Sequence, residues 1–289
     1  MAYTTINKST ENFNTKLYTG NAGTQSITGV GFQPDLTWIK RRNTTGGNMW
    51  TDAVRGVTKT IISNETSAEQ TFANGLTAFG TDGFTVGSEG GFNSANTIAS
   101  WNWKAGNSAG SSNSNGSITS TVSANTTAGF SIVKYTGTGS NATIGHGLGV
   151  APSMIIIKNL TSGRDWLVYH KELGNTHGIY LDLTNASTSS SGFFNNTSPT
   201  SSVFSVGTDT DANDSSDNTI AYCFAEKTGY SKFGSYTGNG STNGTFVFCG
   251  FRPAWVMSKR SDSSDGWRIR DAKRDIDNPA QHRLLANAS

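Results

Sequence analysis

The stretch GFQPDLTWIKRR, residues 31–42, recurs as GVAPSMIIIKNL at 149–160 and as GFRPAWVMSKRS at 250–261. Each copy places a proline three residues after a glycine and follows it with a mostly apolar run that ends in lysine. Proline is tolerated where a strand begins, and the apolar runs are rich in strand-forming residues. We therefore expect a strand after each proline, with Leu36, Trp38 and their equivalents filling a sandwich and the lysine marking where the chain meets solvent.

Further anchors keep the same order around these strands, which is the signature of an internal repeat. A Tyr-Thr-Gly triplet precedes each strand, at 18–20, 135–137 and 236–238. A tryptophan follows each strand, namely Trp50, Trp166 and Trp267. The segments GFTVGS and ASWNWKAG of the first copy match VFSVGT and AYCFAEKTG of the second. The chain is thus divided into residues 1–107, residues 108–228 and an incomplete third unit, residues 229–289.

Composition indicates a β-rich, ordered chain. Of the 289 residues 34% are hydrophobic, only 15% are charged, and 10% are aromatic. Disordered chains lack such aromatic content. Short apolar or alternating runs are separated by turn-forming clusters, and no long amphipathic helix with caps is found. The pattern predicts an all-β protein of tandem β-sandwich or jelly-roll modules. Residues 107–117, NSAGSSNSNGS, are expected to form a flexible linker.

The charge pattern argues against nucleic acid as a partner. The formal net charge is +2, which gives no electrostatic footprint for a polyanion. The basic cluster Arg268, Arg270, Lys273 and Arg274 is interleaved with Asp271 and Asp275 and is interpreted as a solvated face. No apolar run is long enough to span a membrane. The N-terminal MAYTTINKST does not resemble a signal peptide, so action outside a cell would follow lysis or particle assembly.

Aromatic and thiol side chains are interpreted mainly as packing residues. Cys223 and Cys249 lie in apolar runs without metal or disulfide spacing, and buried thiols are expected. A sandwich of about 100 residues needs its repeated aromatics for a core, so sugar stacking is the minority interpretation. These tryptophans are Trp38, Trp50, Trp101, Trp166, Trp255 and Trp267. Trp101 and Trp103 share a face, and Tyr222 and Phe224 hold the equivalent positions.

No catalytic residue is assigned. The histidines His146, His170, His177 and His282 are not at repeated positions, and no nucleophile elbow is found. Two carboxylate pairs, Asp165 with Glu172 and Asp262 with Asp265, lie in expected loops without a matched partner. An undetected carboxylate pair remains an open alternative. The chain is expected to be no enzyme, to need no cofactor, and to offer no identifiable binding residues.

The segment DTDANDSSD, Asp209 to Asp217, partly matches a calcium-binding loop. Asp209, Asp211 and Asn213 fit the first, third and fifth positions, but Asp214 replaces the required glycine and Ile220 the required glutamate. A solvated hairpin tip is favoured over a cation site, so no metal ligand is assigned.

The residues also resemble a family. The stretches MAYTTINKSTENFNTKLYTGNAGTQSI, QPDLTWIKRR, AVRGVTKTIISNETSAE, GFTVGS and WNWKAG resemble uncharacterised virion structural proteins of marine and cyanobacterial tailed phages. GFSIVKYTGTGSNATIGHGLGVAPSMIIIKN and GYSKFGSYTGNGSTNGTFVFCGFRPAWVMSKR are similar to later repeats of those proteins. The resemblance covers almost the whole chain. It implies concanavalin A-like or SPRY-like jelly-roll modules and sugar or protein binding, while the shortened third unit departs from the longer members.

Three functions follow as hypotheses. The first is a virion structural or adhesion protein, such as a tail fibre, that assembles with copies of itself and other virion proteins and recognises host glycan through its variable loops. The second is a free-standing lectin-like module, and the third a polysaccharide depolymerase. An incomplete sandwich exposes apolar edges, so an oligomer or filament with the third unit near the contact is expected.

Overall fold

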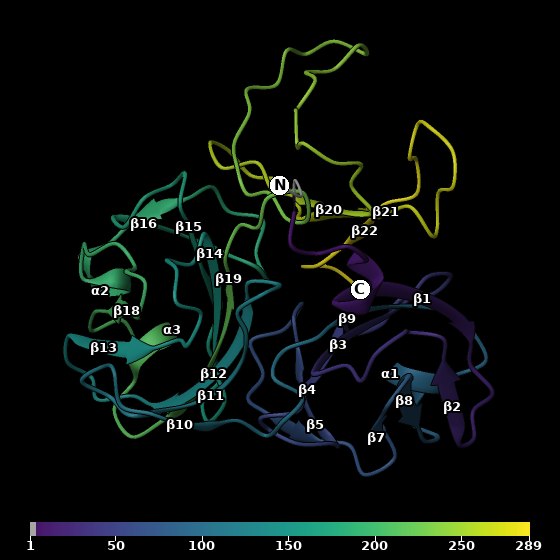
Figure 1. The fold of residues 1–289 in the computed structure, drawn as a ribbon, viewed down its shortest axis with the longest axis horizontal. Helices are drawn as coiled ribbons and strands as arrows, with labels where there is room; N and C mark the ends of the chain where they lie inside the picture. Colours follow the sequence, from purple (N-terminus) through teal and green to yellow (C-terminus); the bar gives the residue numbers. More distant parts are fainter. Residues whose placement is uncertain (1–3) are drawn as a thin grey trace.

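A computed structural model describes residues 4–289 and is nearly all-β (Figure 1). The first unit begins with a short 3₁₀ turn, η1 (Ser9–Glu11). Its strands are β1 (Phe13–Thr19), β2 (Gln25–Thr28), β3 (Leu36–Arg41), β4 (Met49–Asp52), β5 (Lys59–Ile62), β6 (Gln70–Thr71), β7 (Leu76–Gly80), β8 (Gly83–Val86) and β9 (Thr97–Trp103). A helical turn, α1 (Gly90–Asn93), precedes β9. An inner sheet of order β1-β9-β3-β4-β5-β6 packs on an outer sheet of order β2-β8-β7.

The second unit repeats this plan. Its strands are β10 (Ser111–Asn113), β11 (Ser120–Asn125), β12 (Phe130–Thr136), β13 (Ala142–Gly145), β14 (Met154–Asn159), β15 (Trp166–His170), β16 (His177–Tyr180), β17 (Thr188–Ser189), β18 (Val203–Val206) and β19 (Asn218–Phe224). Its helical turns are α2 (Ser191–Phe194) and α3 (Thr210–Asn213). The inner sheet has the order β10-β11-β12-β19-β14-β15-β16-β17, and β13 pairs with β18 in the outer layer. The expectation of a flexible linker over 107–117 is therefore wrong for Ser111–Asn113, because these residues pair with β11.

The third unit contributes one small sheet. Its strands β20 (Trp255–Ser258), β21 (Arg268–Asp271) and β22 (Leu284–Leu285) pair in that order. They correspond to β3, β4 and β5 of the first unit, because Trp255 pairs with Asp271 as Leu36 pairs with Asp52. Residues 230–250 form no strand of four or more residues, whereas the equivalent residues of the first two units form β1 with β2 and β12 with β13.

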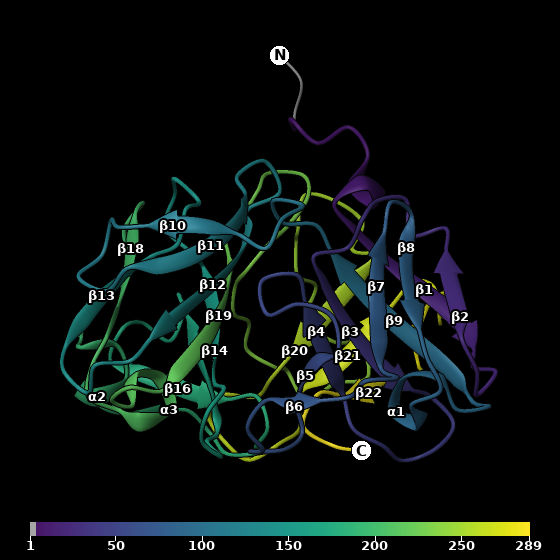
Figure 2. The same ribbon diagram turned by 90° about the horizontal axis from the view of Figure 1, so that it is seen from below.

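The three inner sheets surround a common centre. Seen down the shortest axis, the units occupy the corners of a triangle, with the third unit at the top and β20 to β22 facing inward (Figures 1 and 2). One hydrophobic cluster at this centre draws on all three units, including Trp38, Trp166 and Trp267. Two further clusters lie inside the individual sandwiches of the first and second units. The units therefore share a core in addition to their own.

Burial on both faces explains why the repeated strands read as continuous apolar runs. Along β3, Leu36 and Trp38 point into the shared core, while Ile39 points into the sandwich. The expectation that Leu36 and Trp38 fill a sandwich is thus corrected, since they pack between units. The sequence predicts Lys40 at the solvent boundary, yet this residue is only 4% exposed. A strand flanked by layers on both sides leaves no room for a polar face.

The tryptophans are packing residues, as predicted. Six are buried, with exposures of 9% or less: Trp38, Trp50, Trp101, Trp103, Trp166 and Trp267. Trp255 is only partly buried and packs against the shared core. Strand pairing shows that Trp50 is not equivalent to Trp166 and Trp267. Met49 pairs with Ile62 as Leu167 pairs with Tyr180, so Met49 aligns with Leu167. Asn48 therefore holds the place of Trp166. Of the thiols, Cys223 is buried and Cys249 is partly exposed.

Candidate functional site

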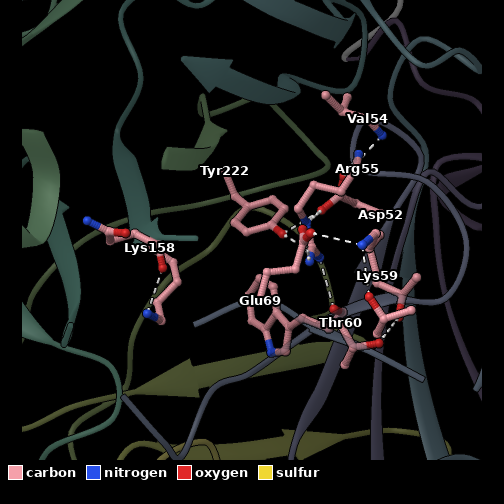
Figure 3. A network of polar contacts seen from close by, with 12 residues as sticks. Asp52, Val54, Arg55, Lys59, Thr60, Glu69, Lys158 and Tyr222 are labelled. Atoms are coloured by element: carbon pink, nitrogen blue, oxygen red, sulfur yellow. Dashed lines mark hydrogen bonds and ion pairs between the residues drawn. The ribbon is translucent and has the colours of Figure 1, made fainter. Parts of the chain in front are cut away.

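A network of buried polar contacts lies at the seam between the first two units (Figure 3). Asp52 ends β4 and accepts hydrogen bonds from the backbone N–H groups of Val54 and Arg55, which close the turn after the strand. The Arg55 guanidinium donates to the other Asp52 oxygen and to the carbonyl of Trp50. Both charged side chains are at most 1% exposed. A buried ion pair of this kind depends on having all its hydrogen bonds satisfied.

The second unit completes this network. The Tyr222 hydroxyl, on β19, donates to Asp52 Oδ2 at 2.7 Å and accepts from Arg55 Nη2 at 3.3 Å. Burial raises the pKa of Tyr222 well above its usual value, and Asp52 adds to the shift. Burial lowers the pKa of Arg55, but the contacts with Asp52, Tyr222 and Glu69 together outweigh it, and the net shift is upward. Tyr222 therefore stays a protonated donor and Arg55 a cation. Glu69 reaches Arg55 Nη1 at 3.5 Å from the partly exposed rim.

The same arrangement recurs at the seam between the third and first units. Asp271 accepts from the backbone N–H groups of Lys273 and Arg274 and from the Arg274 side chain, which is 2% exposed. Trp101, on β9, donates its indole N–H to Asp271 Oδ2 at 3.1 Å. Trp101 is the equivalent of Tyr222, because Phe13 pairs with Trp103 as Phe130 pairs with Phe224. The interpretation of this basic cluster as a solvated face is therefore wrong for Asp271 and Arg274.

Sequence reasoning missed these residues, although a signal exists. The tetrapeptides Asp52-Ala53-Val54-Arg55 and Asp271-Ala272-Lys273-Arg274 share the pattern Asp-Ala-x-Arg at equivalent places. The spacing lets one carboxylate cap the turn and hold the arginine three residues on. The aromatic partner lies 170 residues away in both cases, so the sequence alone could not have supplied it.

The repeated lysines also bind across the seams. Lys40 donates to the carbonyl of Ala288 at 2.7 Å, Lys158 to that of Thr66 at 3.2 Å, and Lys259 to that of Thr184 at 3.2 Å. The first unit thus reaches the third, the second reaches the first, and the third reaches the second. Burial lowers the pKa of Lys40 to about 8, helped by the charge of Arg41, and it lowers the pKa of Lys158 to about 8 against the opposing effect of nearby carboxylates such as Asp182. All three lysines link units; Lys40 and Lys158 are buried, whereas Lys259 is only partly buried.

The third seam differs at its charged position. His170 takes the place of Asp52 and Asp271, because Met154 pairs with His170 as Leu36 pairs with Asp52. Leu173 takes the place of the arginine. The His170 ring lies 6.4 Å from the ring of Phe233 and accepts from the Glu172 backbone N–H. No strand of residues 4–289 brings an aromatic to this seam in the way that β9 and β19 do at the other two.

A second group of titratable side chains lies in the second unit alone. Asp165 precedes β15, Asp182 follows β16, and Asp211 sits in α3, with the Asp165 N–H donating to Asp211. Burial and neighbouring carboxylates raise the pKa of Asp182 to about 7 and that of Asp211 to about 6. Sequence reasoning named Asp165 but paired it with Glu172, which the structure leaves exposed. The carboxylates instead accept backbone hydrogen bonds, as Asp182 does from Trp166, and Asn64 serves the same structural role in the first unit.

The segment 209–217 is not a hairpin tip, which corrects the expectation. It joins β18 in the outer layer to β19 in the inner sheet and contains α3. Asp209 caps this turn, and Asn213 is buried with its amide donating to the carbonyls of Gly207 and Ser140. Within residues 4–289 no group of three or more His, Cys, Asp or Glu side chains is arranged to hold a metal ion.

The remaining candidates are dispersed. Asp262 pairs with Arg260 and Asp265 with Arg268 at the surface of the third unit. His146 is fully buried, its Nδ1 accepting from the Leu148 N–H. Over the described part of the chain, no helix is both long enough and apolar enough to cross a membrane. The polar network can join units, and it presents no exposed nucleophile with a base.

The chain matches the domain of unknown function DUF7483 over residues 8–289 and therefore belongs to that family. No curated protein matches it. No solved structure matches it either.

Proposed function

We propose that this member of the family is a non-enzymatic structural or adhesion protein of a phage particle, built into a tail fibre or another appendage. The observation that carries the proposal is the shared core, which draws on all three repeated units and is accompanied by a lysine contact at every seam. In such an arrangement the polar groups of the seams hold the units together, and the loops between strands lie on the outside.

The placement of the polar groups supports a structural role. Arg55 and Arg274, the two repeated arginines, are buried in ion pairs within the seams. The carboxylates with raised pKa values, Asp35 in the first unit and Asp182 and Asp211 in the second, accept backbone hydrogen bonds. A hydrolase of polysaccharides would instead hold two carboxylates facing a common cleft. The residues support a part that is assembled, in which copies of the chain and other virion proteins are its partners.

Recognition of host glycan is assigned to the loops between strands. The repeated tryptophans that could stack on a sugar are buried, apart from Trp255. This removes the main support for a free-standing lectin with an aromatic platform. The loops differ between units while the strands repeat, which is where binding residues accumulate on a rigid scaffold.

The test is the composition of purified particles. Mass spectrometry of particles separated on a density gradient should detect the chain at a fixed ratio to the other structural proteins. An unrelated non-structural protein from the same lysate serves as the carry-over control. If the chain is absent from particles prepared from several independent lysates, the proposed function is wrong.

A further inference from the structure

One edge of β20 is open in the third unit, at a place that the other units fill. β3 lies between β4 and β9, and β14 lies between β15 and β19. Within residues 4–289, β20 pairs with β21 alone. Val256 is 46% exposed, whereas the equivalent Thr37 and Ile155 are exposed by no more than 1%. A surface that the first two units bury is therefore accessible in the third.

The Tyr-Thr-Gly triplet of the third unit gives an independent sign of the same gap. Tyr18 and Tyr135 donate their hydroxyls to the carbonyls of Phe92 and Ala212, in the helical turns that precede β9 and β19. The equivalent Tyr236 is 60% exposed. The third unit therefore keeps the tyrosine, but residues 4–289 supply it with no counterpart of the helical turn that Tyr18 and Tyr135 contact.

The glycines of the triplets show the same difference between the third unit and the first two. A Cβ at Gly20 would collide with the backbone oxygen of Ser94, and one at Gly137 with that of Asp214, so both glycines are required by the close approach of the turn. A Cβ at Gly238 would meet nothing within 4 Å. In the first two units the triplet is therefore a socket, that is, a close-fitting contact site for the helical turn that leads into the closing strand. Within residues 4–289 no such turn fills the socket of the third unit.

The segment between this triplet and β20 carries exposed apolar side chains. Phe246 is 85% exposed, Phe248 76% and Val247 46%. Counted back from the strand proline, Phe246 stands where Ile27 stands in the first unit, and Ile27 is 3% exposed. Ile27 lies on β2, which pairs with β8 before the closing strand begins. The side chain at this place is therefore buried in the first unit and accessible in the third.

We propose that the third unit accepts a β-strand of the β9 and β19 pattern from a segment outside residues 4–289, inserted antiparallel to β20 between that strand and residues 230–236. This extends the assembly role proposed above but rests on the geometry of the repeats. A second copy of the chain is not the expected donor. Its two strands of the required pattern, β9 and β19, are each already held between two neighbours.

The register of the complete units defines the chemistry of the donor strand. Opposite Leu36 and Met154 lie Trp103 and Phe224. Two residues further along β3 and β14, the partners are again aromatic, Trp101 and Tyr222. Opposite the lysines the partners are the small or aliphatic Ala99 and Ile220. The donor should therefore place aromatic residues opposite Trp255 and Met257 and a small or aliphatic residue opposite Lys259.

The third seam also sets a preference at the middle position. At the other seams the aromatic there donates a hydrogen bond to Asp52 or Asp271. In the third seam it would face His170 and Leu173, which present no carboxylate. A phenylalanine there should thus bind at least as well as a tyrosine, in contrast to what the first seam requires.

The test uses the full chain and a synthetic peptide of residues 207–225, which carries α3 and β19, with Cys223→Ser. A peptide with Ala221→Pro as well is the matched control, because proline removes one backbone donor and breaks the strand. The first peptide should bind saturably and slow hydrogen exchange in residues 230–236 and β20. The proline peptide should bind at least about tenfold more weakly. A Tyr222→Phe peptide should bind as well as the first.

Several results would overturn the proposal. These are no binding by the first peptide, equal binding by the proline peptide, or slowed exchange at the neighbours of β9 or β19 in place of β20. Light scattering of the chain alone should give a monomer, and a stable homodimer with protected β20 would overturn the choice of donor. The peptide result and the particle composition are measured separately, so either proposal can fail without the other.

Discussion

Replacing Asp52 with asparagine should be among the most destabilising single changes that keep side-chain volume. The substitution leaves the Arg55 guanidinium, 1% exposed, with the partly exposed Glu69 at 3.5 Å as its remaining countercharge, and it weakens the bond from Tyr222. Removing one partner of a buried pair costs about 3–5 kcal/mol in the free energy of unfolding. At roughly 2 °C per kcal/mol, the lower end for large domains, the midpoint of thermal unfolding should fall by about 6–10 °C.

Urea unfolding followed by tryptophan fluorescence measures the free energy, and scanning calorimetry measures the midpoint. The matched control is Glu11→Gln, which breaks the Lys8–Glu11 pair, whose side chains are 67% and 58% exposed. This exposed pair should cost no more than about 1 kcal/mol. If Asp52→Asn costs as little as the control, the Asp52–Arg55 pair does not hold the seam and the reasoning fails.

Further changes test other parts of the account. Tyr222→Phe removes one hydrogen bond to the Asp52 carboxylate and should lower the free energy of unfolding by about 1.5–3 kcal/mol in urea titrations; no change would mean that the bond is replaced by water. Tyr135→Phe should cost about 1 kcal/mol, whereas Tyr236→Phe should stay within about 0.5 kcal/mol, and equal losses would contradict an empty third socket. The raised pKa of Asp182, about 7, gives stability that is present below pH about 4 and lost as the pH rises through 7. Asp182→Asn should therefore gain stability relative to the wild type between those pH values, by roughly 1–4 kcal/mol, and a constant difference across the range would refute this.

The repeat and the strands could be predicted from sequence because they depend on local pattern. The Gly-x-x-Pro entry, the apolar run and the lysine mark β3, β14 and β20 in each unit. The same pattern could not say where the two faces of each strand point. The pattern predicts Leu36 inside a sandwich and Lys40 at the solvent boundary, because an isolated unit would have only one covered face.

The seams could not be predicted because their partners come from separate repeats. Asp52 meets Tyr222, and Asp271 meets Trp101, only after the units are arranged around one centre. No local spacing encodes that arrangement. The repeated Asp-Ala-x-Arg pattern could have indicated a shared structural role for the two turns, though not the aromatic donor.

Hydrogen exchange of the isolated full chain measures both the shared core of the three units and the open edge of β20. The account predicts slow exchange throughout β3, β9, β14 and β19, and fast exchange in residues 230–250 and at the open edge of β20. Exchange in residues 230–258 as slow as that in β3 and β14, for a chain that is monomeric, would contradict it.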